Sequence, residues 1–211
     1  MPRNTKKALD FLSKQTWLKN SKWYLAGGTA LALLAGHRCS VDLDFFLPKS
    51  KFDEKKLLGR FVEQPVWKTN FKEPGTVYGE LFKAKVSFIA YPVFIPKGQP
   101  QFYGFVRILP LADIAVMKVI AISQRGRKRD FFDLYWCAKN NEPLINIIKR
   151  LKTQYPLVAH DYHHLLKSLV YFDDAENDPQ PMINFKISWK EVKKFFQKEI
   201  PIIAKKLIEL A

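Results

Sequence analysis

Apolar and polar positions follow two different periods along this 211-residue chain. Up to Pro110, short runs rich in β-branched and aromatic residues are typical of strands, and helical segments separate them. The expected strands are a short one that ends before Gly27, one that carries Asp42 and Asp44 and ends at Pro48, three in close succession over 66–71, 76–82 and 85–91, and one near 105–109. Pro74 and Gly75 favour antiparallel pairing in the group of three.

Helical spacing of apolar positions predicts further elements in the same half. We expect a helix over residues 5–20, another of roughly two turns after Gly27 and Gly28, and a third over 52–63. Residues 92–104 contain several prolines and glycines, so they predict a long loop.

After Pro110 the pattern becomes helical throughout. The helices are expected over 111–124, 128–139, 144–152, 160–172 and 188–210. Residues 173–181 are acidic and contain prolines, which predicts a linker, and Pro201 predicts a break or kink in the last helix. The pattern therefore predicts an α/β (α+β) protein, with a mixed sheet and flanking helices over residues 1–110 and a helical region over 111–211.

Charge is the unusual feature of the composition. Lys and Arg number 35 against 20 Asp and Glu, which gives a formal net charge of +15. Such an excess favours polyanionic partners such as nucleic acid, and scattered lysines that only aid solubility are the alternative. Cys39 and Cys137 show no metal or redox spacing and indicate a reducing compartment. With neither a signal segment nor an apolar run long enough to span a bilayer, we expect a cytoplasmic protein with no membrane partner.

The candidate chemistry starts at the double glycine. Gly27 and Gly28 allow a sharp turn and a close approach of a phosphate, and Thr29 is placed to cap the helix that follows. The free N–H groups of that helix favour an anion. Asp42 and Asp44 stand two positions apart on a strand, so both carboxylates point to one face. Two hard oxygen ligands beside a phosphate-binding turn suit Mg²⁺ that holds a nucleoside triphosphate.

A second cluster lies in the helical half. Lys118 interrupts a helix that is apolar almost all round, where a lysine either extends its ammonium to solvent or contacts the triphosphate or the aspartates. Asp130 and Asp133 follow one turn apart at the start of the next helix. Asp130 is a candidate third acid of the site, whereas for Asp133 we favour an ion pair with Arg125 or Arg129.

These motifs together resemble a known family. Gly27-Gly28-Thr29, Gly36-His37-Arg38, Ser40 and Asp42-Leu43-Asp44-Phe45-Phe46 are similar to the signature of the AbiEii/AbiGii nucleotidyltransferase toxin family, within the polymerase-β-like nucleotidyltransferase superfamily. Lys118 and the run from Arg129 to Leu134 resemble its later motifs. The resemblance implies a nucleotidyltransferase-type mixed sheet and transfer of a nucleotide from an NTP to an acceptor. The implied acceptor is RNA, most specifically a tRNA 3′ end, and the implied protein partner is a cognate antitoxin.

The resemblance also implies roles for individual residues. The metal ligands, for Mg²⁺ or Mn²⁺, would be Asp42 and Asp44. Asp130 would assist metal binding or activate the attacking hydroxyl, and Lys118 would contact nucleotide phosphates. The implied catalytic residues are Asp42, Asp44, Lys118 and Asp130, and the implied nucleotide-binding residues are Gly27, Gly28, Thr29, Arg38, Ser40 and Lys118.

One position departs from the superfamily pattern. Ser87 stands near where many of these enzymes carry a third carboxylate, and a serine cannot replace an anionic ligand. Either Asp130 or Glu80 completes the site, or the metal site is weak. Two alternative functions therefore stay open, a catalytically weak nucleotide- or RNA-binding protein and a nucleotidyltransferase that acts on a small molecule.

Overall fold

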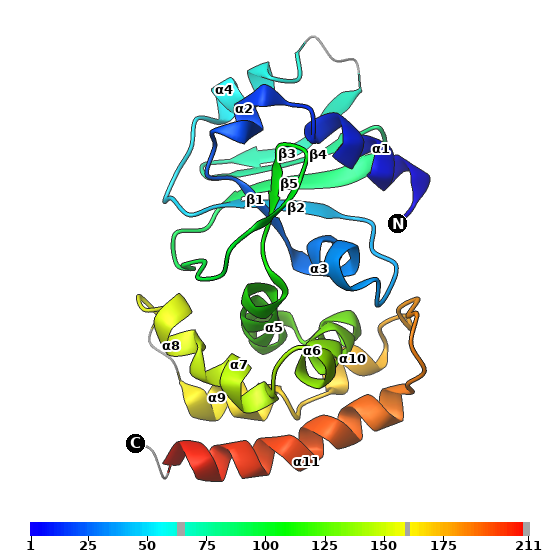
Figure 1. Cartoon of the computed structure of the whole chain (residues 1–211), viewed down its shortest axis with the longest axis vertical. Helices are drawn as coiled ribbons and strands as arrows, with labels where there is room; N and C mark the ends of the chain where they lie inside the picture. Colours follow the sequence, from blue (N-terminus) through cyan, green and yellow to red (C-terminus); the bar gives the residue numbers. More distant parts are fainter. Residues whose placement is uncertain (63–65, 159–160, 209–211) are drawn as a thin grey trace. The chain divides into compact units, whose positions relative to one another are not determined.

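The computed structural model of the chain describes residues 1–62, 66–158 and 161–208 (Figure 1). The chain divides into two compact units, Met1–Pro110 and Leu111–Ala211. The first unit is a mixed sheet with helices, and the second is helical. The fold class expected from the sequence, an α/β (α+β) sheet followed by a helical region, is confirmed.

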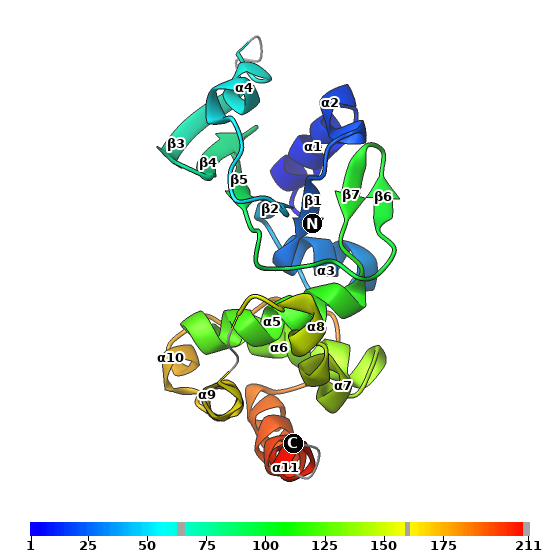
Figure 2. The same cartoon turned by 90° about the vertical axis from the view of Figure 1, so that its left-hand side faces the viewer.

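The described part of the first unit contains one mixed sheet of seven strands. Their order is β3-β4-β5-β2-β1-β7-β6, which Figure 2 shows from left to right. The neighbouring pairs β2–β5 and β1–β7 are parallel and the other neighbouring pairs are antiparallel, as expected for the three successive strands. The strands are β1 (Tyr24–Ala26), β2 (Leu43–Leu47), β3 (Trp67–Glu73), β4 (Thr76–Leu81), β5 (Ala84–Ala90), β6 (Gln101–Tyr103) and β7 (Val106–Ile108).

Helices of the first unit pack onto this sheet. Helix α3 contacts β1 and β2, helix α1 contacts β5, and helix α2 contacts β7. The bounds are α1 (Arg3–Leu12), α2 (Thr16–Lys19), α3 (Gly27–Ala35) and α4 (Glu54–Gly59).

The opening helix and the long loop both differ from expectation, and the two segments contact each other. The single helix predicted over 5–20 is split into α1 and α2, and the predicted loop over 92–104 contains β6. Gly104, with φ +57°, makes the turn between β6 and β7, and a Cβ there would collide with the Ser13 carbonyl. The same carbonyl accepts the Phe105 N–H at 2.7 Å, so the hairpin binds the chain where the first helix ends.

The second unit is built around helix α5. Helices α6, α7 and α9 pack against it, and α6 also contacts α10 and α11 (Figure 1). The bounds are α5 (Leu111–Arg125), α6 (Lys128–Asn140), α7 (Leu144–Lys149), α8 (Leu151–Gln154), α9 (Tyr162–Ser168), α10 (Asp173–Glu176) and α11 (Trp189–Ile208).

Parts of this unit differ from expectation, and the helix predicted over 144–152 is divided into α7 and α8. The expected linker over 173–181 begins with helix α10, and the Lys128 ammonium anchors the segment by donating to the Glu176 and Asp178 carbonyls at 3.0 and 2.7 Å. Helix α11 is continuous through Pro201, so the predicted break is absent, and Phe196 and Ile203 bury its apolar side before and after the proline. Parts of three predicted helices lie outside the described residues, namely residues 63, 160 and 209–210.

Among the described residues, no helix combines the length and the apolar run that a bilayer crossing requires.

Phe88 on β5 organises the core of the first unit. It is fully buried and lies within 5.1–6.3 Å, centroid to centroid, of five aromatic rings. Those rings come from helical, loop and strand segments, and they belong to Trp17, Trp23, Phe45, Phe61 and Trp67. One side chain therefore connects the sheet to the helices that cover this face.

Phe88→Ala is expected to lower the free energy of unfolding by about 3–5 kcal/mol, because it leaves a cavity among rings that cannot collapse into it. Urea unfolding of the full chain measures this change. Val62→Ala serves as the control, since Val62 is 79% exposed and its loss should change stability by less than about 0.5 kcal/mol. Equal effects of the two substitutions would contradict this account of the core.

Candidate active site

The double glycine lies at the junction between β1 and α3. Gly27, with φ +71°, and Gly28 are the first two residues of α3, so the N–H groups of its first turn have no partner within the helix. The predicted cap at Thr29 is wrong, because the helix starts two residues earlier and no side chain caps it. The Thr29 hydroxyl instead donates to Ser40 Oγ at 2.9 Å.

Pairing of β1 with β2 brings the glycines beside the aspartate. Ala26 is the Cα partner of Asp44, so the next residue, Gly27, passes close to that carboxylate. A Cβ on Gly27 would lie 3.0 Å from Asp44 Oδ2. The absence of a side chain therefore lets the turn pass close to the carboxylate.

Gly28 is enclosed by the segment that leads from α3 to β2. A Cβ at this position would collide with the Arg38 guanidinium and lie 3.1 Å from Ser40 Oγ. Arg38 is 7% exposed, and its Nη1 donates to the Cys39 carbonyl at 2.9 Å. The structure thus gathers the predicted residues of the first unit around one turn, with a guanidinium and a hydroxyl facing the start of α3.

Ser87 supports Asp44 from the neighbouring strand. The two residues are Cα partners in the parallel β2–β5 pair, and Ser87 Oγ donates to Asp44 Oδ1 at 2.8 Å. The position that departs from the superfamily pattern therefore orients a carboxylate instead of supplying one. Glu80, the alternative third acid, accepts a hydrogen bond from Asn70 Nδ2 at 3.3 Å.

Asp42 and Asp44 both line a cavity of about 220 Å³ on this face of the sheet. The other lining residues come from β3, β4 and β5, and they are Asn70, Tyr78, Gly79, Lys85, Val86 and Ser87. Burial, followed by the negative charges of Asp44 and Glu73, raises the pKa of the Tyr78 hydroxyl, which therefore stays protonated near neutral pH. The cavity thus combines two carboxylates with hydroxyl and amide groups.

This donor set fits a magnesium-type cation that the substrate itself helps to bind. Within the described residues, no group of three or more His, Cys, Asp or Glu side chains is placed to hold a metal. Mg²⁺ is commonly bound by one or two carboxylates together with substrate phosphates and water. Asp42 and Asp44, which line one cavity, meet that requirement.

The predicted site residues of the second unit form a buried ion network. Lys118 Nζ lies 2.6 Å from Asp130 Oδ1 and 2.7 Å from Asp133 Oδ2, and Arg125 Nε donates to Asp130 Oδ2 at 3.0 Å. The side chain of Lys118 is 5% exposed and both aspartates are 0% exposed, so the lysine does not extend to solvent. Asp133 pairs with Lys118, whereas we expected Arg125 or Arg129.

The network keeps Asp130 ionised. Burial on its own raises the pKa of this carboxyl, but the positive charges of Lys118 and Arg125 outweigh burial and hold the pKa below its usual range. Both carboxylate oxygens already accept hydrogen bonds from these cations. The visible role of Lys118 and Asp130 is to join α5 to α6, and their contact with phosphate or metal stays a prediction.

Comparison with known proteins decides the family. The sequence profile described as "Nucleotidyl transferase AbiEii toxin, Type IV TA system" matches residues 11–204. The chain belongs to the AbiEii nucleotidyltransferase toxin family. This assignment confirms the resemblance that its motifs indicate and supports an enzymatic activity of the nucleotidyltransferase type.

This AbiEii-family chain is also similar in sequence to one relative and in fold to solved structures. An uncharacterized protein of Aquifex aeolicus (strain VF5), aq_aa25, is 35% identical over 182 residues, which cover 84% of this chain and 86% of that protein. The fold is similar to that of JHP933 from Helicobacter pylori, with a TM-score of 0.56, 22% identity and coverage of 98% and 93% of the two chains. The fold is also similar to that of MenT4, a nucleotidyltransferase toxin from Mycobacterium tuberculosis H37Rv. Here the TM-score is 0.56, the identity is 14%, and the match covers 96% of this chain and 86% of that chain.

Sequence reasoning missed part of this AbiEii-family cavity. Asn70, Tyr78 and Lys85 line it beside the predicted aspartates. The alternation of side chains along a predicted strand indicates which residues of that strand share a face. It does not give the register between one strand and the next. Only the observed pairing of Tyr78 with Ser87, and of Ser87 with Asp44, places Tyr78 in one row with the carboxylate.

Lys118→Met is expected to lower the free energy of unfolding by about 3–5 kcal/mol, because it removes the ammonium that two buried carboxylates contact. Urea unfolding followed by circular dichroism measures the loss, with Arg129→Met as the control at an exposed position. Since the pKa of Asp130 is lowered, the stabilisation is present above the unfolded pKa of about 3.9 and is lost as the pH falls below it. Unchanged stability at neutral pH would contradict a structural role for the network.

Proposed function

We propose that this protein transfers a nucleoside monophosphate from an NTP to the 3′ hydroxyl of an RNA, and that it acts as the toxin of a toxin–antitoxin pair. The family assignment supports nucleotidyl transfer, and one arrangement supports an NTP with a bound cation as its substrate. Gly27 and Gly28 start α3 close beside Asp44, and Asp42 lines the same cavity as Asp44.

The start of α3 is proposed to bind the triphosphate. The free N–H groups of its first turn and the positive end of its dipole favour phosphate oxygens. Arg38 adds a fixed positive charge beside Gly28, and the Ser40 hydroxyl, held by Thr29, adds a hydrogen-bonding group. Phosphoryl-type transfer depends mainly on positioning and charge neutralisation, which these groups supply.

Asp42 and Asp44 are proposed to hold a divalent cation, Mg²⁺ or Mn²⁺, through their carboxylate oxygens. Bound there, such a cation supplies charge neutralisation at the α-phosphate and lowers the pKa of the attacking hydroxyl. Ser87 keeps Oδ1 of Asp44 oriented by its hydrogen bond. In the reaction the 3′ oxygen bonds to the α-phosphorus, the bond from that phosphorus to the bridging oxygen breaks, pyrophosphate leaves, and water takes the hydroxyl proton.

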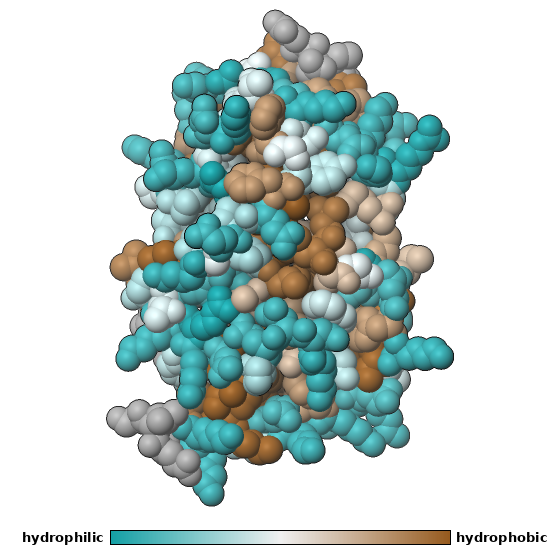
Figure 3. All heavy atoms as spheres, in the orientation of Figure 1, coloured by the Kyte–Doolittle hydropathy of each residue, from teal (hydrophilic) through white to brown (hydrophobic). Residues whose placement is uncertain are grey.

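An RNA acceptor is supported by charge. The chain carries a net charge of +15, and hydrophilic side chains cover much of the face drawn in Figure 3. Contacts with phosphates supply most of the sequence-independent affinity of such surfaces for nucleic acid. A cationic small-molecule acceptor would instead require an acidic pocket, and the cavity of Asp42 and Asp44 already commits its carboxylates to the proposed metal. Within RNA, we propose a tRNA 3′ end as the acceptor, on the strength of the family resemblance.

Incubation of the full chain with each labelled NTP, Mg²⁺ or Mn²⁺ and total RNA tests this function. We expect label to enter a tRNA-sized band, and Asp44→Asn to reduce incorporation by at least about 10²-fold, as expected when a group that stabilises the developing charge is lost. Asp53→Asn is the matched control, because Asp53 only caps α4 and asparagine caps equally well. Removal of the metal with a chelator should abolish labelling.

Two results would contradict the proposal. Binding of NTP without label in any RNA indicates a protein that binds nucleotides without turnover. Label in RNA that Asp44→Asn does not reduce indicates that the reaction takes place elsewhere on the chain.

A further inference from the structure

A row of side chains crosses the sheet from the proposed metal ligand to the edge strand. Asp44 on β2 pairs with Ser87 on β5, Ser87 pairs with Tyr78 on β4, and Tyr78 pairs with Phe71 on β3. Directly paired residues of neighbouring strands point to the same face. At about 4.8 Å between strands, Tyr78 lies about 10 Å and Phe71 about 14 Å from Asp44.

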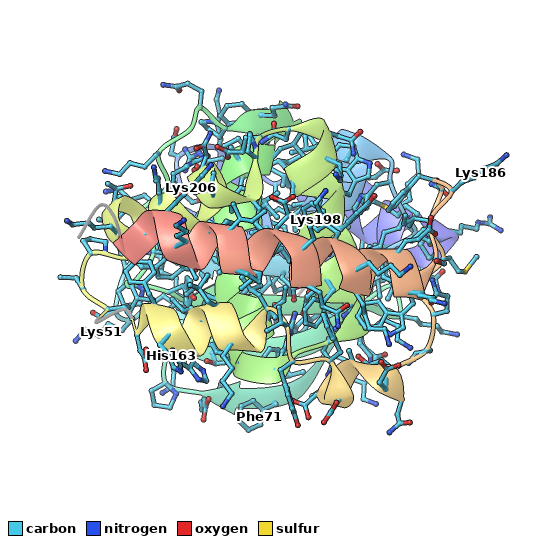
Figure 4. All side chains as sticks on the ribbon, turned by 90° about the horizontal axis from the view of Figure 1, so that it is seen from below. Lys51, Phe71, His163, Lys186, Lys198 and Lys206 are labelled. Carbon is cyan, nitrogen blue, oxygen red and sulfur yellow. The ribbon has the colours of Figure 1, made fainter. Side chains whose placement is uncertain are left out.

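The outer half of this row is an exposed aromatic surface. Tyr78 is 42% exposed and Phe71 is 47% exposed, and the two rings stack with centroids 5.8 Å apart and planes 28° apart. Figure 4 shows the Phe71 ring pointing outward from its ribbon. Tyr78 also lines the cavity of Asp42 and Asp44, so the stacked pair continues from the proposed active site.

The geometry of the proposed reaction indicates whether the NTP or the acceptor lies on the side of Tyr78 and Phe71. The glycine turn follows β1, and the sheet order puts β1 on one side of β2 and β5, β4 and β3 on the other. The triphosphate and the aromatic pair are therefore on opposite sides of Asp44. In an in-line displacement the attacking hydroxyl approaches the phosphorus opposite the leaving group. The side of Tyr78 and Phe71 is accordingly the side of the acceptor.

Charges beside the row also fit an RNA strand. Lys68 on β3 pairs with Glu80 on β4, and Glu80 pairs with Lys85 on β5, so a second row flanks the first. Both lysines are exposed. Aromatic rings for bases beside cations for phosphates are the common combination in sites for single-stranded nucleic acid.

We propose that Phe71 and Tyr78 form a stacking platform for the unpaired bases at the 3′ end of the acceptor RNA. This inference rests on the proposed function, because that function defines which side of Asp44 the acceptor occupies. The platform binds the strand and presents its terminal hydroxyl toward Asp44. Stacking is tolerant of sequence, so the platform recognises a single-stranded end and not a particular base.

Binding of a fluorescent single-stranded RNA of mixed sequence with a free 3′ hydroxyl tests the platform. The measurement uses the full chain carrying Asp44→Asn, so that turnover does not interfere. Tyr78→Thr and Phe71→Thr are each expected to weaken binding between about fivefold and about a hundredfold, the loss that follows removal of one stacked base contact. Threonine keeps the strand preference, and Tyr78→Phe should restore the affinity. Phe102→Thr, at a 62% exposed aromatic residue on β6, is the matched control and should change nothing.

The outcomes separate this inference from the proposed function. Normal RNA affinity in both threonine variants, or no binding of single-stranded RNA at all, would overturn the platform, whether or not nucleotide transfer is observed. A loss of NTP affinity in Tyr78→Thr, with RNA affinity kept, would also overturn it by assigning the ring to the base of the incoming nucleotide. Platform-dependent RNA binding in a chain that never transfers label supports the inference and counts only against the proposed function.

Discussion

The candidate site depends on the absence of side chains at two adjacent positions. Because β1 pairs with β2, the chain leaving β1 must pass Asp44, and a Cβ on Gly27 would lie 3.0 Å from Oδ2 of that carboxylate. A Cβ on Gly28 would meet the Arg38 guanidinium. Glycine at both positions therefore lets α3 start close beside the carboxylate and the guanidinium.

Side chains alternate along the strands of the sheet, so the aromatic core residues and the residues of the proposed site point to opposite faces. On β2, Phe45 packs into the core while Asp44 points to the other face, and on β5 Phe88 and Ser87 are divided in the same way. A slip of one residue in this register would exchange the two faces. The aromatic packing around Phe88 therefore also fixes the position of the carboxylate.

Much of this arrangement could be predicted from the sequence, because it is local. Glycines before a helix, and aspartates two positions apart on a strand, can be recognised within a few residues. The spacing of apolar residues likewise predicted most of the strands and helices. Strand β7 was expected, but its partner β6 was missed because Gly104 turns against Ser13, far away in the sequence. The row from Asp44 to Phe71 was missed for a related reason, since strand pairing sets it and no local pattern reports the register.

The central claim is that the glycine turn and Asp44 form one site for a metal-bound triphosphate, and substitution at Gly28 tests it most directly. Its backbone does not require a positive φ, so alanine acts mainly through its Cβ. Calorimetric titration of the full chain with NTP and Mg²⁺ should show Gly28→Ala binding about tenfold more weakly, since the added Cβ must displace the Arg38 guanidinium that is proposed to face the triphosphate. Gly59→Ala, where no atom lies within 4 Å of the added Cβ, should bind as the wild type does. Equal affinity in the two variants would contradict the claim.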